Sequence, residues 1–340
     1  MLDRKNLFEL AKVVANANPS SQVAYSFGDD KFSYSELNNT LRNELKELAG
    51  TYQLYRENKN LIFSLIEDTI DDVLPRKVLE QYGMFADVKV FANGDKPVFT
   101  QKISNSARKR AKQFITKVGL AGVYEVFKLD GKSYEIPTEA FGGAAQIGFE
   151  EFLDGRVDFS DVLDIVMEGL DECVYKEIEK ALKAAVINLQ ANNKKTETQF
   201  VEKSMDDLLA VADSYGRSAI YCTVEFAATM KPDKEWASDA HKNQMWANGY
   251  ITDYKGHNVI VLPQSYEDET NSKKVIDPSH CYIIPTGAEK PVKIAIEGQT
   301  AVREVENYDW SREVQVYKKL GVGAIITNNI CVYINTSLQQ

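Results

Sequence analysis

One segment constrains the fold of this chain more than any other. Apolar side chains recur at three- and four-residue steps over roughly eight helical turns, which predicts an amphipathic helix over 158–191 with Asp158 as its N-cap. At about 1.5 Å per residue this helix is roughly 45 Å long, more than the ordinary helix of a globular domain. Its apolar positions are Phe159, Val162, Leu163, Val166, Leu170, Val174, Ile178, Ala181, Leu182, Ala185 and Leu189.

The start of this helix is acidic, and an earlier part of the chain is basic. From Glu150 to Glu172 there are nine Asp and Glu residues, and only Arg156 opposes them. No acidic residue lies between Lys96 and Tyr124. Charge runs of this kind are most often solvated faces, although two opposite runs can also meet across a contact. The acidic candidates are Asp154, Asp158, Asp161, Asp164 and Glu168; the basic ones are Lys102, Arg108, Lys109, Arg110, Lys112 and Lys117.

The first 85 residues predict helical pieces joined by polar turns. A leucine repeat at 41, 45 and 48 indicates one amphipathic helix, and a second is expected from about 60 to 74. Pro75 is expected to start a new segment. Nothing nearby in the sequence obviously buries the apolar stripes of these helices. We therefore expect an arm that lies on something else.

From Ala86 the apolar period changes from helical spacing to alternation, which is typical of strands. Turn residues at 93–97 and at Asp130-Gly131 predict two hairpins, and Gly142-Gly143 is expected to end the segment. The stretch from 86 to about 148 is thus a long β excursion with a basic middle. Its hairpin strands are expected at 88–90 with 98–99, and at 123–127 with 134–136.

The second half of the chain predicts mostly strands. A shorter helix at 200–213 leads into a buried strand at 218–224, and a loop is expected at 232–248. The last segment, 312–335, alternates as a long strand that bends near Gly321 and Gly323. Further strands are expected at 250–251 with 259–263, at 281–284 and at 292–296.

Composition limits what such a chain can do. With 40 Lys and Arg against 50 Asp and Glu, the net charge of -10 argues against broad wrapping of nucleic acid, which needs a basic face. Charges within the first 17 residues leave no apolar core for a signal peptide, and the uncharged segment 321–340 is too polar to span a bilayer. The widely spaced Cys173, Cys222, Cys281 and Cys331 are typical of small buried residues in a reducing compartment.

Motifs for catalysis and for metal or cofactor binding are incomplete. The histidines at 241, 257 and 280 lack metal-ligand spacing, so we expect no metal and no cofactor. Gly131-Lys132-Ser133 resembles the end of a phosphate-binding loop, but Val126 occupies the position of its first glycine. The carboxylates of the long helix could in principle pair for acid and base chemistry, but their spacing fits a charged surface better. We expect no enzyme activity.

Several segments resemble major capsid proteins of tailed bacteriophages. The resemblance covers about residues 40–340. Each segment alone has low specificity, and their order along the chain carries the likeness. The segments are 96–100, 142–159, 259–266, 289–294 and 321–329.

The resemblance implies the Hong Kong 97-type capsid fold, an α+β architecture. It implies an N-terminal helical arm at 1–85 and an extended β loop at 86–149. A peripheral domain would comprise 150–205, with the spine helix 158–191, and 290–325. An axial domain would comprise 206–289 and 326–340, and the final strand would run from the peripheral into the axial domain.

The resemblance also implies a structural protein that self-assembles as hexamers and pentamers into an icosahedral shell around double-stranded DNA. Scaffolding protein, portal protein and decoration proteins are the expected partners, with packaged DNA nearby and no membrane. A separate scaffolding protein is expected because no long segment precedes the arm. Assembly would take place in the bacterial cytoplasm and leave the protein in the virion.

The two opposite charge runs then acquire a joint interpretation. We expect the basic loop of one subunit to lie over the acidic start of the spine helix in an adjacent subunit. Two other functions stay open: an encapsulin-like shell that encloses an enzyme, and an enzyme or carbohydrate-binding module with an unrecognised site. Closed shells or hexamer rings would distinguish a capsid from the last of these, and DNA or protein cargo would separate the two kinds of shell.

Overall fold

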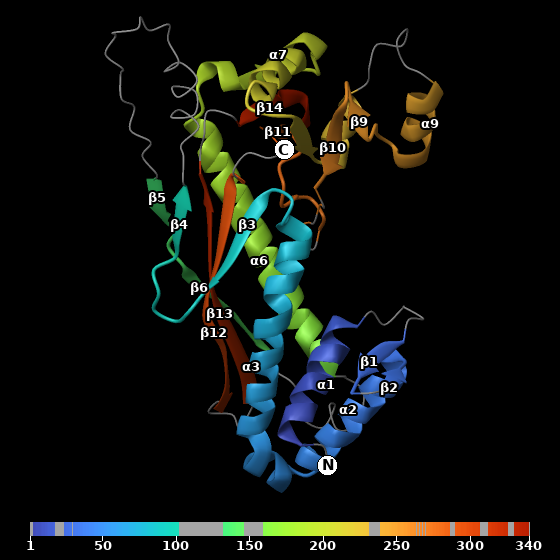
Figure 1. Cartoon of the computed structure of the whole chain (residues 1–340), viewed down its shortest axis with the longest axis vertical. Coiled ribbons are helices and arrows are strands. Elements are labelled where there is room, and N and C mark those ends of the chain that lie inside the picture. The colour runs from blue at the N-terminus through green and yellow to red at the C-terminus, as the bar shows by residue number, and fades with distance from the viewer. Residues whose placement is uncertain are drawn as a thin grey trace, which may run out of the picture.

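The computed structural model describes residues 3–17, 24–28, 30–101, 132–145, 159–230, 239–262, 264, 266, 268, 270–285, 290–306, 312–325 and 330–339. Helices and strands both contribute, which confirms the α+β class. The described chain forms a helical module at one end, a four-stranded sheet in the middle and a six-stranded sheet at the other end (Figure 1).

The N-terminal module contains three helices and a short hairpin. Ser33 and Glu36 form a capping box at the start of the second helix, and the Thr51 hydroxyl accepts from the Leu54 N–H at the start of the third. These caps fix where the two longer helices begin. The elements are α1 (Arg4–Asn16), β1 (Tyr25–Phe27), β2 (Asp30–Phe32), α2 (Tyr34–Ala49) and α3 (Tyr52–Tyr82).

The expectation that this arm leaves its apolar stripes unburied is wrong. The leucines of α2 are buried, and they join a large core with apolar residues of α1 and α3. Three helices, each with one apolar stripe, bury those stripes against one another, and no partner outside the chain is needed for that. The buried leucines of α2 are Leu37, Leu41, Leu45 and Leu48.

Pro75 does not start a new segment, which corrects a second expectation. It lies inside α3, a single helix of 31 residues. Proline removes the hydrogen bond to the carbonyl four residues earlier, here that of Asp71, and this costs about 3 kcal/mol in a helix interior. Buried side chains on both sides of the proline, among them Val73 and Val78, provide packing that offsets this cost.

The four-stranded sheet has the order β3-β12-β13-β6. β3 is parallel to β12, whereas the other two pairs are antiparallel. Helix α3 lies along one face of this sheet, where Ile294 and Ile296 of β12 enter the large core. The strands are β3 (Ala86–Phe91), β6 (Glu139–Ala145), β12 (Val292–Glu306) and β13 (Arg312–Ala324).

A separate two-stranded ribbon pairs β4 (Val98–Gln101) with β5 (Lys132–Glu135). This pairing corrects the first predicted hairpin, because 88–90 belongs to β3 and pairs with β12 rather than with 98–99. Residues 134 and 135 pair with β4, and their predicted partners at 123–127 lie outside the described residues, so the second hairpin stays a prediction. Gly142 and Gly143 do not end the excursion, since both lie within β6.

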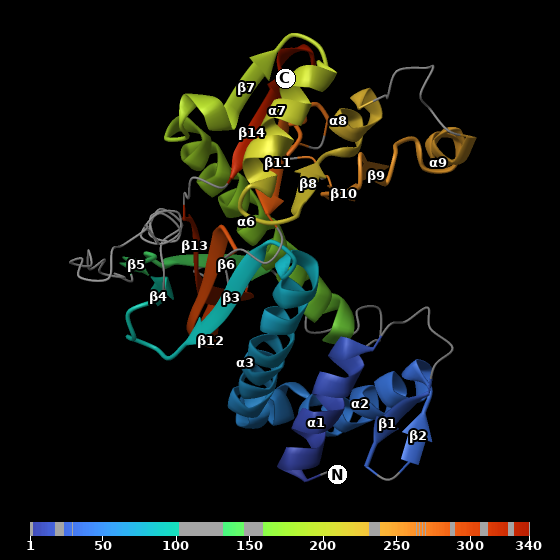
Figure 2. The same ribbon diagram turned by 45° about the horizontal axis from the view of Figure 1, so that its top comes forward.

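The predicted long helix is confirmed as α6 (Phe159–Ile187). Its 29 residues correspond to about 43 Å at the α-helical rise. It ends four residues before the predicted 191, and η1 (Ala191–Asn193) and β7 (Lys194–Glu197) follow. The predicted N-cap, Asp158, lies outside the described residues. Figures 1 and 2 show α6 running from the six-stranded sheet to the N-terminal module, so one helix spans both regions.

The six-stranded sheet has the order β7-β14-β11-β8-β10-β9. Side chains of its central strands alternate between two cores: Tyr221 and Tyr282 face the large core, whereas Ile220 and Ile283 face a second core with α7 and α8. Both faces are therefore covered. The elements are α7 (Glu202–Asp213), β8 (Ser218–Cys222), α8 (Val224–Thr229), β9 (Asp253–Tyr254), β10 (His257–Val261), β11 (His280–Pro285) and β14 (Cys331–Asn335).

Two expectations for the second half need correction. The final segment is not one strand, because β13 lies in the four-stranded sheet and β14 in the six-stranded sheet, and η2 (Thr336–Leu338) follows. The second half of the loop expected at 232–248 forms α9 (Asp239–Asn248). Helix α9 has no regular apolar spacing, which is why the sequence predicted a loop.

Candidate assembly surfaces

The ribbon β4–β5 carries the chain to and from the predicted basic loop. Gln101 and Lys132 are paired at its end, so the chain leaves and re-enters the described structure at adjacent positions. The predicted basic contact residues, Lys102, Arg108, Lys109, Arg110, Lys112 and Lys117, lie outside the described residues. Their contact with another subunit stays a prediction.

The ribbon is held on the four-stranded sheet, on the face opposite α3, by a small apolar cluster. Phe99 of β4 and Ile136 after β5 pack against Ala295 of β12, and all three are buried. The neighbouring strand β13 contributes glycines here: a Cβ on Gly321 would lie 2.5 Å from the Pro137 carbonyl oxygen. These glycines were expected to bend the strand. Instead β13 continues through both, and their lack of side chains lets the ribbon approach the sheet.

The predicted acidic face of the long helix is only partly described. Asp154 and Asp158 lie outside the described residues, and so do the side chains of Asp161 and Asp164. Glu168 is exposed, as the prediction requires. The contact between the two charge runs stays a prediction.

Further along α6, acidic side chains already have partners within the chain. Glu172 lies 2.7 Å from the Lys176 ammonium on the next turn. Asp171 accepts a hydrogen bond from the Tyr82 hydroxyl of α3 at 3.1 Å, and burial raises the pKa of this carboxyl above its ordinary value. Asp171 and Glu172 are therefore engaged within their own chain, whereas Glu168 is exposed.

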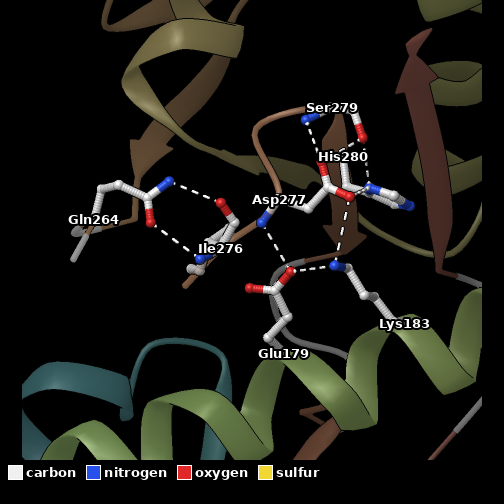
Figure 3. Close-up of polar contacts among 7 residues, drawn as sticks. All are labelled: Glu179, Lys183, Gln264, Ile276, Asp277, Ser279 and His280. Carbon is white, nitrogen blue, oxygen red and sulfur yellow. Dashed lines mark hydrogen bonds and ion pairs between the residues drawn. The ribbon is translucent and has the colours of Figure 1, made fainter. Parts of the chain in front are cut away.

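A polar junction joins α6 to the loop that begins β11 (Figure 3). A carboxylate oxygen of Glu179 accepts the Asp277 N–H at 2.8 Å and lies 2.9 Å from the Lys183 ammonium. Lys183 also lies 3.4 Å from the Asp277 carboxylate. On the other side, the Gln264 side chain exchanges two hydrogen bonds with the Ile276 backbone, at 2.8 and 3.0 Å. The junction thus fixes the position of β11, and with it the six-stranded sheet, along the axis of α6.

Burial and hydrogen bonding shift the two carboxyl groups of the junction in opposite directions. Burial raises the pKa of Glu179, although Lys183 and the Asp277 N–H oppose it. Burial alone would also raise the pKa of Asp277, but hydrogen bonds from His280 and Ser279 outweigh burial and hold it well below its ordinary value. Of these two carboxyl groups, Asp277 is therefore the one whose ionised form the folded structure stabilises.

Ser279, His280 and Asp277 place a hydroxyl, an imidazole and a carboxylate together, as hydrolases do. In a hydrolytic triad the imidazole lies between the other two groups. Here the Ser279 hydroxyl donates directly to Asp277 at 2.6 Å and also lies 2.9 Å from the His280 ring. This geometry is that of a hydrogen-bonded turn at the start of β11. Among the described residues, no group of three His, Cys, Asp or Glu side chains could hold a metal ion.

The cysteines are free thiols. Cys222, Cys281 and Cys331 are buried in the second core, as predicted, and Cys173 is half-buried. Burial raises the pKa of Cys331 to about 12, which disfavours its thiolate. These residues therefore behave as small apolar side chains.

Two large apolar side chains are highly exposed outside the regions described above. Trp246 on α9 is 94% exposed, and Ile187 at the end of α6 is 80% exposed. Figure 2 shows α9 at the margin of the molecule, beyond β9. The sequence did not predict this feature because 232–248 was interpreted as a loop.

Buried charged side chains are the structural features of these surfaces that the sequence did not predict. The Lys318 side chain of β13 is only 2% exposed, and its ammonium lies 2.6 Å from Asp71 of α3. Lys293 of β12 is similarly buried and lies 3.2 Å from Asp87 of β3. Alternation along a strand normally directs charged residues to solvent. Here α3 and the ribbon pack on opposite faces of the sheet, so alternating side chains on either face can be buried, these lysines among them.

The sequence matches the model of one known protein family. A family model described as "SPbeta prophage-derived putative capsid protein YonB" matches residues 8–334. No curated protein matches the chain in sequence. Among the helices of the described residues, none is long and apolar enough to cross a membrane.

Solved structures of similar shape include both virus and cellular shells. The capsid of Helicobacter pylori bacteriophage KHP30 is 14% identical, with a TM-score of 0.49 over 75% of this chain and 90% of that one. The capsid of cyanophage P-SCSP1u is 9% identical, with a TM-score of 0.48 over 75% and 87%. The SrpI encapsulin of Synechococcus elongatus PCC 7942 is 11% identical, with a TM-score of 0.44 over 74% and 86%.

Proposed function

The chain belongs to the YonB family of prophage-derived capsid proteins, and from this premise we propose that its copies assemble as hexamers and pentamers into an icosahedral shell around phage double-stranded DNA. The protein is a capsid protein, a structural component of a virion. The family match over 8–334, almost the whole chain, is the observation that carries this conclusion. We propose further that the chain has no catalytic role.

The architecture supports self-association through protruding elements. The ribbon β4–β5 packs on the four-stranded sheet and leads the chain to the predicted loop, and α6 connects that sheet to the six-stranded one. We assign the arm to 1–85, the extended loop to 86–149 and the peripheral domain to 150–205 with 290–325. The axial domain then comprises 206–289 with 326–340. The long helix and the sheets give these parts a rigid frame from which the loop can reach a neighbour.

The contact that we propose between subunits is electrostatic. The basic loop, represented by Arg108, Lys109 and Arg110, lies over the acidic start of α6 in the adjacent subunit, where Glu168 is exposed. Each exposed pair contributes about 0–1 kcal/mol and is screened by salt, so the stabilisation comes from repetition over many copies. The other acidic members of this contact are Asp154, Asp158, Asp161 and Asp164.

Electron microscopy of the purified protein tests the function directly. Closed shells or hexamer rings are expected, and a uniform monomer would contradict the proposal. Nuclease-resistant double-stranded DNA inside shells from infected or induced cells supports a virus capsid, whereas an enclosed enzyme identifies a nanocompartment. We propose scaffolding and portal proteins as assembly partners, with decoration proteins on the finished shell. Assembly would take place in the host cytoplasm.

A charge reversal tests the contact. Changing Arg108, Lys109 and Arg110 together to Glu is expected to reduce the yield of shells at low salt, because repulsion replaces attraction. The matched control reverses three exposed lysines outside the loop, Lys46, Lys203 and Lys242, and so changes the net charge equally. Normal shells from the loop variant would end the electrostatic proposal but leave the capsid function intact.

A further inference from the structure

Strand β12 contains an irregularity at the place where the ribbon meets the sheet. Its pairing with β13 shifts between Glu297 and Ala301, and Gly298 adopts a φ of +70° in this bulge. A left-handed backbone of this kind favours glycine. Bulges re-aim the chain and end regular pairing, so they often serve a structural purpose.

On the face of the sheet that the ribbon covers, the Glu297 carboxylate accepts hydrogen bonds from residues before and after the ribbon. Glu297 accepts the Gly94 N–H at 3.2 Å and the Thr138 hydroxyl, and the Lys319 ammonium lies 3.5 Å away. Gly94 precedes β4 and Thr138 follows β5. The two points at which the chain leaves the sheet and returns to it are therefore joined through a single side chain.

On the other side, helix α3 holds the bulge. The carboxylate of Asp71 accepts the Thr300 N–H at 3.0 Å, and the Val302 N–H donates to Glu67 at 2.8 Å. Lys318 bridges the Asp71 carboxylate and the Gly298 carbonyl. Every one of these contacts falls within or next to the bulge, so its backbone is fixed from the helix side.

We propose that Glu297 is a positioning residue for assembly: it sets the angle at which the ribbon leaves the four-stranded sheet. The proposal rests on the proposed shell function, in which the loop must reach the next subunit. The apolar cluster of Phe99, Ile136 and Ala295 attaches the ribbon to the sheet but imposes little direction, because apolar contact is not directional. The hydrogen bonds of Glu297 are directional and therefore fix the angle.

A carboxylate suits this position because it only accepts hydrogen bonds. Glu297 receives donors from a backbone N–H, a hydroxyl and an ammonium. These hydrogen bonds, that of Thr138 foremost, hold the pKa of Glu297 below its ordinary value. A glutamine has the same shape, but it is neutral and offers one acceptor oxygen, so the Thr138 hydroxyl would have to turn and accept from its amide. Glu297→Gln therefore removes the charge and weakens these hydrogen bonds without changing side-chain volume.

The test compares Glu297→Gln with Glu304→Gln. Glu304 lies on the same strand beyond the bulge, where its partner is Lys59 of α3 at 3.5 Å. Shell yield and diameter are measured by electron microscopy, and hydrogen exchange reports on the Gly94 amide and on the strands 98–101 and 132–135. Glu297→Gln is expected to lower the yield of uniform shells about tenfold and to speed exchange of the Gly94 amide at least tenfold. Glu304→Gln is expected to assemble as the wild type does.

A second variant guards against misfolding. Thr138→Val removes one donor to Glu297 but keeps the side-chain shape. It is expected to lower the yield of uniform shells as well, and it serves as the test if Glu297→Gln does not fold. Uniform wild-type shells from both variants, or unchanged exchange at Gly94, would overturn the proposal. Failure of the wild type itself to form shells would contradict the proposed function instead. Hydrogen exchange in the unassembled protein then still decides whether Glu297 fixes the ribbon.

Discussion

The four-stranded and six-stranded sheets are both covered on two faces, yet they bury different side chains. Within the described residues, the four-stranded sheet buries Lys293, Glu297 and Lys318, whereas buried polar residues of the six-stranded sheet, such as Ser218 and Asn335, are neutral. Burying a charge is costly unless partners surround it. Each buried charge here has such partners, and those partners belong to other elements.

This difference separates two tasks within one subunit. The six-stranded sheet is stabilised mainly by apolar burial, with a second core of its own. The four-stranded sheet connects a helix and a ribbon that must keep defined directions, and directional ionic contacts supply that geometry. We infer that the ionic contacts of the four-stranded sheet fix the orientation of α3 and of the ribbon relative to each other. Four predictions test this comparison, from the largest expected effect to the smallest.

The largest effect is expected for Lys318→Ala. The substitution leaves the Asp71 carboxylate without its ammonium and with only its Thr300 hydrogen bonds, which we expect to cost about 3–5 kcal/mol. Urea unfolding of the purified variant measures this loss. Arg76→Ala, which breaks a surface pair with Asp72 on the same helix, serves as the control at about 0–1 kcal/mol. A loss below about 1 kcal/mol for Lys318→Ala would remove the distinction between the sheets.

A smaller effect is expected for Tyr333→Phe in the six-stranded sheet. The Tyr333 hydroxyl accepts the Val201 N–H at 2.8 Å and donates to the Gln199 carbonyl at 3.0 Å. Losing both bonds leaves two neutral groups unpaired. We expect this to lower the free energy of unfolding, measured in urea, by about 1–3 kcal/mol. Tyr317→Phe, at an exposed position, is the matched control and should be neutral. A cost above that of Lys318→Ala would reverse the comparison.

The polar junction predicts a dependence on pH. The folded-state pKa of Asp277 lies below the ordinary 3.8, so its charge stabilises the fold above that pH, and the contribution is lost as the pH falls through the lowered value. Lys183, Ser279 and His280 face this carboxylate, and Glu179 accepts from the Asp277 N–H beside it. Asp277→Asn should therefore be less stable than wild type at pH 5, and the difference in melting temperature should shrink toward pH 2.5. A difference that stays constant over this range would refute the assignment.

The smallest effect is expected for Trp246→Ala. Because this side chain is 94% exposed, its removal should change the free energy of unfolding by less than about 0.5 kcal/mol. Melting temperatures of the unassembled variant and the wild type measure the change. Ile283→Ala, in the fully buried part of the same region, provides the contrast at about 2–5 kcal/mol. A large loss for Trp246→Ala would mean that α9 packs on its own subunit.

Several elements followed from the sequence because their signals are local. The spacing from Phe159 to Leu189 predicted α6 within a few residues, and the buried runs at 218–224 and 281–284 predicted β8 and β11. The turn before β4 was also recognised. Its two flanking strands were nevertheless assigned to each other, because a sequence shows where a turn lies but not which strand a neighbour pairs with.

Other features depended on distant parts of the chain. Continuation of α3 through Pro75 requires packing on both sides of the proline, which local propensity does not include. The role of Gly321 was misjudged for the same reason, since the Pro137 backbone that approaches it comes from another segment. The predicted contact residues remain a proposal, because the basic loop lies outside the described residues and no second subunit is present.

The sequence by itself determined the long helix and the alternation of the strands, since each depends on residues within a few turns of one another. Only the tertiary structure decided that Lys318 is buried against Asp71 and that Glu297 joins both ends of the ribbon segment. The physical reason is that burial of a charge depends on what covers the sheet. The covering elements here, α3 and the ribbon, lie some two hundred residues away along the chain.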